Sequence, residues 1–242
     1  MVLFDKSALM KPPERPPLSR RPEDPPPPPW AQSPAALLGS RPGHVRAALT
    51  GGVASGKSTA AELLTAFGAD LIDFDELARQ ALEPQTPGWE AAAALFGPKM
   101  VRPDQTLDRL KIASLIFKKP LLRAELENII HPRTWELMIQ RLKDLEASPL
   151  IIIDVPLLFE ANLQSLFSPV IVCFCPSDLQ YRRLRARDPH KSRRLAKKMI
   201  LSQMPMAEKV RLGTFIINNN GSLRSLIRQT KRIWLDLTGR AE

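Results

Sequence analysis

Eight consecutive residues have the types and spacing needed to hold the phosphates of a nucleotide. Residues 51–58 are Gly-Gly-Val-Ala-Ser-Gly-Lys-Ser, which matches the pattern Gly, four residues, Gly-Lys-Ser. The glycines allow successive backbone N–H groups to turn inward around phosphate oxygens. Lys57 can reach the β- and γ-phosphates, and the Ser58 hydroxyl is placed to ligate Mg²⁺. We predict a nucleoside triphosphate site formed by Gly51, Gly52, Val53, Ala54, Ser55, Gly56, Lys57, Ser58 and Thr59.

The elements around this loop have the order that such a loop requires. An apolar run at 45–50 predicts a buried strand before it, and an apolar face over 57–67 predicts a helix after it. Further strands are predicted at 71–73, 150–154, 170–175 and 215–218, and helices at 76–82, 121–145 and 223–237, with an interruption at Pro132. Strands separated by helices predict parallel pairing. The fold class expected is therefore a three-layer α/β sandwich of the P-loop type.

The net charge is concentrated in the last third of the chain. The whole sequence has 35 Lys and Arg against 25 Asp and Glu, whereas residues 171–242 alone have 16 against 5. Such a basic region indicates an anionic partner, either nucleic acid or a small polyphosphate. The Asn-Lys-x-Asp motif of guanine-specific switches is missing from the sequence. A kinase that acts on a phosphorylated acceptor needs basic side chains to screen the repulsion between the phosphates of donor and acceptor. We therefore expect a small polyphosphate, and no nucleic acid, as the partner of this region.

Residues 1–44 differ from the rest in composition. They hold 12 of the 24 prolines, and we expect them to form a disordered or polyproline-like tail before a catalytic domain at 45–242. A solvated tail is the simpler interpretation, and docking of its proline motifs on a partner protein is the alternative. No membrane span is predicted. Two cysteines favour core packing and a reducing compartment, the cytoplasm, with organelle targeting left open.

Beyond the loop, several segments together resemble the dephospho-CoA kinase family, from about residue 45 to about 237. The similar segments are the loop at 49–59, Asp-x-Asp-x-x-Ala-Arg within 72–79, Phe96-Gly97, Leu107-Asp108-Arg109, His131-Pro132, Asp-Val-Pro-Leu-Leu-Phe-Glu at 154–160, Gln180, Arg183, Arg187 and Gln203. The resemblance implies transfer of a phosphoryl group from ATP, with Mg²⁺, to the ribose 3′-hydroxyl of dephospho-CoA. The substrate-side helices would form an insertion in the sandwich, beside a basic lid.

The resemblance also implies roles for single residues. Asp75 would be the base that takes the proton of the acceptor hydroxyl. Asp73 would orient the metal or its waters on the substrate side, with capping of the following helix as the alternative. Asp154 ends an apolar run, where it would hold Mg²⁺ or Ser58, or else bond a loop. Substrate contacts are expected from Arg79, Arg109 and His131, against a plain Asp75–Arg79 pair or simple packing as the alternatives.

The basic segment 180–198 resembles a mobile lid. Within it, Arg183 is expected to stabilise the transferring phosphoryl group, and Arg187 to bind the nucleotide. Asn219 matches the adenine-side loop of the family. The sequence departs from the family at Thr214 and Asn218, where Asp is usual, and this leaves the base contacts open. The alternatives to this function are another small-molecule or nucleotide kinase, and a nucleotide-binding scaffold.

Overall fold

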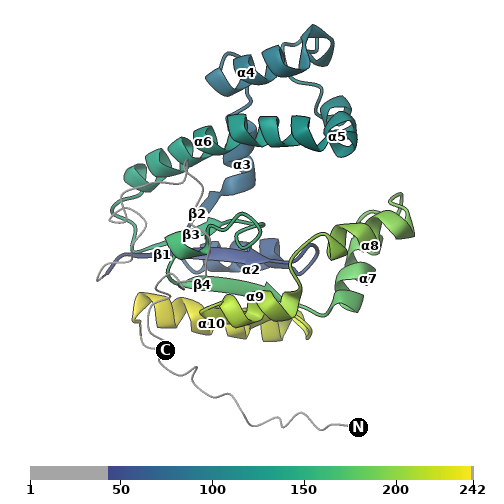
Figure 1. Ribbon diagram of the computed structural model, residues 1–242. Coiled ribbons are helices and arrows are strands. Elements are labelled where there is room, and N and C mark those ends of the chain that lie inside the picture. Colours follow the sequence, from purple (N-terminus) through teal and green to yellow (C-terminus); the bar gives the residue numbers. More distant parts are fainter. Residues whose placement is uncertain (1–42, 241–242) are drawn as a thin grey trace.

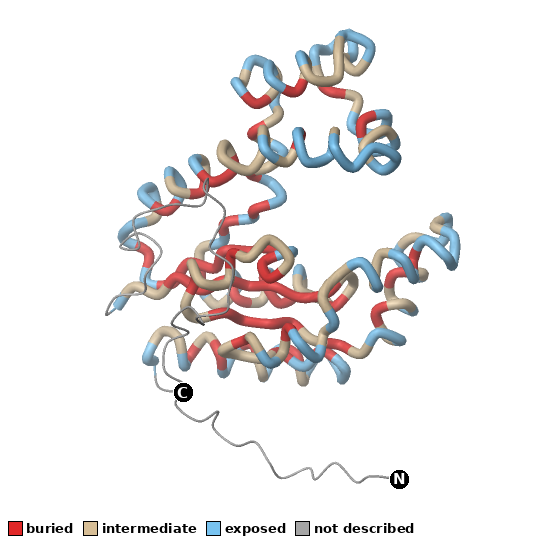
Figure 2. The backbone as a smooth tube through the Cα atoms, viewed as in Figure 1, coloured by how far each residue is buried: buried red, intermediate tan, exposed pale blue. Residues whose placement is uncertain are grey.

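A computed structural model describes residues 43–240, and its centre is a parallel sheet of five strands (Figure 1). The strands are β1 (Val45–Gly51), β2 (Asp70–Asp73), β3 (Leu150–Asp154), β4 (Val170–Phe174) and β5 (Phe215–Asn218). Their order across the sheet is β2-β3-β1-β4-β5, and every neighbouring pair is parallel. In β3 and in the interior of β1 all residues are buried, because helices cover both faces (Figure 2).

Two separate apolar clusters show that the sheet is the middle layer of three. On one face, α3 (Phe74–Gln80), α6 (Pro120–Asp144) and α9 (Met206–Leu212) pack over the side chains of Ala48, Ile151 and Val172. On the other face, α2 (Lys57–Ala66) and α10 (Leu223–Thr238) pack over Leu49, Ile152 and Cys173. Alternate residues of a strand point to opposite faces, so both faces need apolar side chains. The predicted α/β sandwich is confirmed.

A third apolar cluster lies away from the sheet. It joins α4 (Pro87–Phe96), the 3-10 helix η2 (Pro98–Met100), α5 (Arg109–Lys118) and the first half of α6. Its buried residues are Ala92, Leu107, Ile112 and Leu126. Figure 1 shows these helices standing apart from the sheet above its carboxyl end. They form the predicted helical insertion.

The predicted interruption at Pro132 is wrong, because α6 runs without a break from Pro120 to Asp144. Both halves of the helix are held by packing, with Leu126 in the insertion cluster and Trp135 and Met138 in the sheet cluster. The Thr134 hydroxyl donates to the Ile130 carbonyl at 2.9 Å, which supplies a further helix bond beside the proline. The packing of both halves of α6 therefore outweighs the cost of the Pro132 ring, which removes one backbone hydrogen bond from the helix.

At the carboxyl end of the sheet two helices project from the body. These are α7 (Ser177–Arg187) and α8 (Arg193–Leu201), which pack on each other and whose outer surface is largely exposed (Figures 1 and 2). The remaining element of residues 43–240 is the 3-10 helix η3 (Gln164–Leu166) between β3 and β4. Among residues 43–240, no helix is long and apolar enough to cross a membrane.

The predicted tail lies almost wholly outside the described residues. Its last residue, His44, lies against the body, with Nδ1 3.1 Å from the Ser148 carbonyl oxygen. Cys173 and Cys175 are both buried free thiols behind the phosphate-binding loop, as the core-packing interpretation predicts. Burial raises the pKa of Cys173 to about 12, so the thiol stays protonated and unreactive at neutral pH.

Candidate active site

The Gly-rich segment forms a tight loop between β1 and α2. It leaves the sheet at Gly51, turns through Ala54 at φ 56°, and enters α2 at Lys57 after Gly56 at φ 90°. Gly56 has a second reason to lack a side chain, since a Cβ there would overlap the amide nitrogen of Asn219. Lys57 and Ser58 therefore begin the helix with their N–H groups directed at the loop, where a phosphate group would lie.

The loop is held from behind through its carbonyl oxygens. The Ser55 carbonyl accepts hydrogen bonds from Asn219 Nδ2 at 2.8 Å, Arg183 Nη1 at 3.3 Å and Cys173 Sγ at 3.4 Å. The guanidinium of Arg183 also donates to the Asn219 carbonyl at 3.0 Å. Because the carbonyls are bound outside, the N–H groups can face inward, as a nest for anions requires.

Lys57 and Asp154 form a close ion pair beside the loop. The Lys57 ammonium lies 2.5 Å from both carboxylate oxygens of Asp154, which is the last residue of β3. The predicted metal carboxylate is therefore paired with the predicted phosphate-binding lysine, and not with Ser58. Burial raises the pKa of Asp154, Lys57 opposes that rise, and Asp73 and Asp75 add to it.

The two aspartates after β2 have different surroundings. Asp73 caps α3, accepting hydrogen bonds from the N–H groups of Asp75 at 2.8 Å and Glu76 at 3.1 Å. This is the capping role that was the alternative for Asp73. Burial raises the pKa of Asp75, the Asp73 carboxylate adds to that rise, and Lys57 and Arg79 oppose it. A carboxylate with a raised pKa accepts a proton more readily, which suits a general base.

One cavity brings most of the predicted nucleotide residues together. Its volume is about 510 Å³, and all nine loop residues from Gly51 to Thr59 line it, with Asp75, Pro156, Arg183, Arg187 and Gln203. These residues come from the loop after β1, from three helices on different faces of the sheet and from the segments after β3 and α8, and they line one cavity at the carboxyl end of the sheet. Ligands of open parallel sheets bind at that end.

The predicted substrate residues Arg79, Arg109 and His131 lie on the helical side. Arg79 pairs with Glu76 at 3.1 Å, so the predicted alternative of an Asp75–Arg79 pair is wrong as a direct contact. Arg109 Nη2 donates to the Arg79 carbonyl at 3.4 Å, which links α5 to α3. His131 is half-buried in α6, where burial lowers the pKa of its ring and Glu127 opposes that shift.

The two predicted lid arginines line the cavity, whereas Asn219 of the predicted adenine-side loop does not. Arg187 lines the cavity and also pairs with Asp188 at 3.4 Å. Asn219 is buried behind the loop rather than in the cavity wall. Thr214 precedes β5 and bonds to Val170, with Oγ1 accepting from Val170 N at 3.1 Å. It lies at the opposite end of that strand from Asn218, so the two departures from the family pattern are not in one place in the structure.

Two residues at the site had no role assigned from the sequence. Gln203 follows α8, and its Oε1 accepts from the Val53 N–H at 2.8 Å. Lys209 in α9 is fully buried, 2.8 Å from Glu160 Oε1 and 3.4 Å from the Gly51 carbonyl oxygen. No local signal marked Lys209, which is one of three charged residues in the seven-residue helix α9. Its role depends on Glu160, which is 49 positions away in the sequence.

The order of the parallel strands, the loop after β1 and the Lys57–Asp154 pair define a P-loop kinase fold with a nucleotide site. The family model for dephospho-CoA kinase matches residues 45–225, and the chain belongs to this family. A dephospho-CoA kinase from Anaeromyxobacter dehalogenans is 39% identical over 193 residues, covering 79% of this chain and 91% of the relative. One from Geobacter sulfurreducens is 39% identical over 188 residues, covering 77% and 95%.

Solved structures agree with this assignment. A Thermus thermophilus protein superposes with a TM-score of 0.71 at 34% identity, covering 81% of this chain and 99% of that one. The dephospho-CoA kinase from Campylobacter jejuni superposes with a TM-score of 0.63 at 25% identity, covering 80% and 97%.

Proposed function

We propose that this chain phosphorylates the ribose 3′-hydroxyl of dephospho-CoA with ATP, giving coenzyme A and ADP, and that Asp75 is the base of the reaction. Family membership supports the overall reaction. The observation that carries the assignment of Asp75 is its place in the same cavity as the phosphate-binding loop, Arg183 and Arg187. An acceptor hydroxyl bound beside Asp75 would face the γ-phosphate held by the loop.

The residues then divide the reaction between them. Asp75 takes the proton as the hydroxyl oxygen attacks the γ-phosphorus, and the bond from that phosphorus to the ADP oxygen breaks. Lys57 exchanges the Asp154 carboxylate for phosphate oxygens and offsets their charge. Arg183, which already holds the loop, and Arg187 add positive charge on the lid side. The helical side, with Arg79, Arg109 and His131, is where we place the acceptor.

Mg²⁺ is the second ligand that we propose for this site. Among residues 43–240, no group of three or more His, Cys, Asp and Glu side chains is arranged to hold a metal by itself. The donors still fit Mg²⁺, because Ser58 and Asp154 supply oxygen atoms, and nucleotide phosphates usually complete its ligands. When bound, Mg²⁺ would neutralise charge on the β- and γ-phosphates.

The reaction is tested with purified protein, ATP, Mg²⁺ and a panel of acceptors. We expect coenzyme A by mass spectrometry from dephospho-CoA, and at least a hundredfold lower rate with AMP or shikimate. Asp75→Asn should bind ATP but form almost no product. A higher rate with another acceptor would favour the alternative of a different small-molecule kinase. ATP binding without any phosphoryl transfer would favour a scaffold.

We also propose that this reaction takes place in the cytoplasm and that the catalytic domain spans 45–242, after a separate segment at 1–44. The two described cysteines are free thiols, which suits a reducing compartment. Fluorescence microscopy of a tagged chain tests the compartment. A pull-down with a peptide of residues 1–42, compared with one in which its prolines are replaced by alanine, tests a proline-dependent protein partner.

A further inference from the structure

We infer that Lys209 and Glu160 form a positioning pair. The pair fixes the start of the phosphate-binding loop at Gly51 and attaches to it the link between α8 and α9, which we call the base of the lid. The inference concerns the nucleotide site of the proposed function and rests on that function. Neither side chain lines the cavity of about 510 Å³, so neither is expected to touch the substrates. Their effect would reach ATP through the backbone of the loop.

The burial of Lys209 is the first observation. Its side chain has 0% exposure and that of Glu160 has 21%, with Nζ and Oε1 2.8 Å apart. Lysine is almost never fully buried unless it is paired. A buried ion pair adds little net stability, because removing both charges from water offsets their attraction. The pair therefore has to be explained by what it holds in place.

The second observation is the third partner of this pair. Lys209 Nζ lies 3.4 Å from the carbonyl oxygen of Gly51, the residue at which β1 ends and the loop begins. The peptide at Gly51 has little room to move, since a Cβ there would lie 2.7 Å from both the Cys173 carbonyl and Ser55 Oγ. A donor on the Gly51 carbonyl sets the plane of the peptide that leads into the loop.

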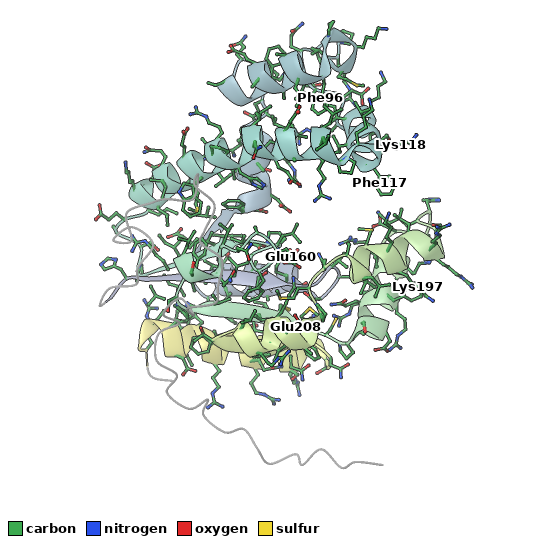
Figure 3. All side chains as sticks on the ribbon, in the orientation of Figure 1. Phe96, Phe117, Lys118, Glu160, Lys197 and Glu208 are labelled. Carbon is green, nitrogen blue, oxygen red and sulfur yellow. The ribbon has the colours of Figure 1, made fainter. Side chains whose placement is uncertain are left out.

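The third observation is that the same pair reaches the link between α8 and α9, which follows the lid segment 180–198. Glu160 Oε1 also accepts from the N–H of Met204, at 2.9 Å. Met204 belongs to the short link between α8 and α9, next to Gln203, whose side chain accepts from Val53 N–H at 2.8 Å. The base of the lid is thus attached to the loop at two residues, Gly51 and Val53. Figure 3 labels Glu160 beside the sheet, and Glu208, the neighbour of Lys209, on α9.

The pair could affect ATP binding either through its electric field or through the position of the loop, and the signs of its two charges distinguish these possibilities. Lys209 and Glu160 together carry no net charge, so at the triphosphate their fields largely cancel. An effect on ATP binding has to come from the position of the loop. Removing both charges at once should therefore restore the stability that a single change costs, while the loop remains without its anchor.

The experiment uses the full chain with Lys209→Met, Glu160→Gln and the double variant. The matched control is Glu208→Gln, an exposed acid one position before Lys209 on the same helix (Figure 3). Melting temperature is measured by calorimetry, and Kd for ATP with Mg²⁺ and for dephospho-CoA by titration calorimetry. We expect lower melting temperatures in both single variants and recovery in the double variant. The Kd for ATP should rise at least tenfold in Lys209→Met and in the double variant, with that for dephospho-CoA within twofold.

Two results would overturn the inference. One is a folded double variant that binds ATP as tightly as the wild type. The other is an equal loss of affinity for both ligands, which would indicate general loosening. A measurement on the wild-type chain needs no variant, because hydrogen exchange at the Val53 amide, which donates to Gln203 Oε1 at 2.8 Å, should be slow; fast exchange there contradicts the attachment of the loop to the link between α8 and α9. If the wild type itself fails to phosphorylate dephospho-CoA, the proposed function is wrong instead.

Discussion

Gly56→Ala is the change whose effect on ATP binding follows most directly from the structure. Gly56 adopts φ +90°, and a Cβ there would meet the amide nitrogen of Asn219. That nitrogen donates to the Ser55 carbonyl at 2.8 Å, so alanine would have to displace the bond that holds the loop from behind. The substitution thus adds backbone strain and removes an anchor at the same point.

The two costs can be added. A residue with a side chain in the left-handed region costs roughly 1–2 kcal/mol. The lost Asn219–Ser55 hydrogen bond costs about 1 kcal/mol, because Arg183 and Cys173 still donate to the same carbonyl. The sum is about 2–3 kcal/mol. If the loop relaxes to avoid this cost, ATP affinity falls by roughly 30- to 150-fold, at 1.4 kcal/mol for each factor of ten.

The matched control is Gly68→Ala. Gly68 also has a positive φ, +102°, but a Cβ there would meet nothing within 4 Å. It should lower the melting temperature through backbone strain alone and leave ATP affinity unchanged. In the double variant Gly56→Ala/Asn219→Ala the overlap is relieved, so its ATP affinity should exceed that of Gly56→Ala.

Titration calorimetry with ATP and Mg²⁺ measures these affinities, and circular dichroism confirms that each variant is folded. The reasoning is refuted if Gly56→Ala binds ATP within threefold of the wild type. It is equally refuted if Gly68→Ala weakens ATP binding as much as Gly56→Ala does.

Three further predictions concern the acid groups and the lid. Asp75→Asn should lower kcat by about 10²- to 10⁴-fold with ATP affinity within twofold, and raise the melting temperature, since burial disfavours the carboxylate; kinetics within tenfold of wild type contradict this. Activity needs ionised Asp75, so kcat/KM is lost as pH falls through its raised pKa. Asp73→Asn removes the charge that helps to raise the pKa of Asp75, while Asn can still cap α3. The pH at which kcat/KM is lost on the acid side should therefore fall, and an unchanged pH profile contradicts this prediction. Arg183→Lys cannot make both bonds, to the carbonyls of Ser55 and Asn219, and calorimetry should show ATP affinity at least tenfold weaker; unchanged affinity would exclude the anchoring role.

Local patterns were sufficient to predict the sheet. The strands at 150–154 and 215–218 were predicted with the bounds that the structure has, because each is a short apolar run between loop residues. The phosphate-binding loop was predicted for the same reason, since all of its chemistry lies in eight consecutive residues. Pro132 was misjudged because the packing of Leu126 and Trp135 that holds the helix together lies in two different clusters.

The other features that the sequence did not predict depend on contacts between residues far apart in the chain. The ion pair of Asp154 could not be read from its own segment, because its partner Lys57 is 97 positions earlier; its metal role stays a prediction. Asn219 was expected on the nucleotide side and lies behind the loop instead, because its place depends on Ser55 and Arg183. Lys209 looked like one more basic residue of a charged region. Its burial follows from the side-by-side packing of α9 and the segment that carries Glu160, which no local pattern records.

The unbroken course of α6 has a consequence for how the enzyme moves. One rigid rod is embedded at its far end in the sheet layer, through Trp135, Met138 and Leu142, and at its near end in the insertion, through Leu126. The insertion cannot move relative to the sheet unless α6 moves with it, and that would disrupt the packing of α6 against the sheet. We therefore expect that opening and closing around the two substrates comes from α7 and α8, while the helical insertion, where we propose that the acceptor binds, stays fixed on the sheet.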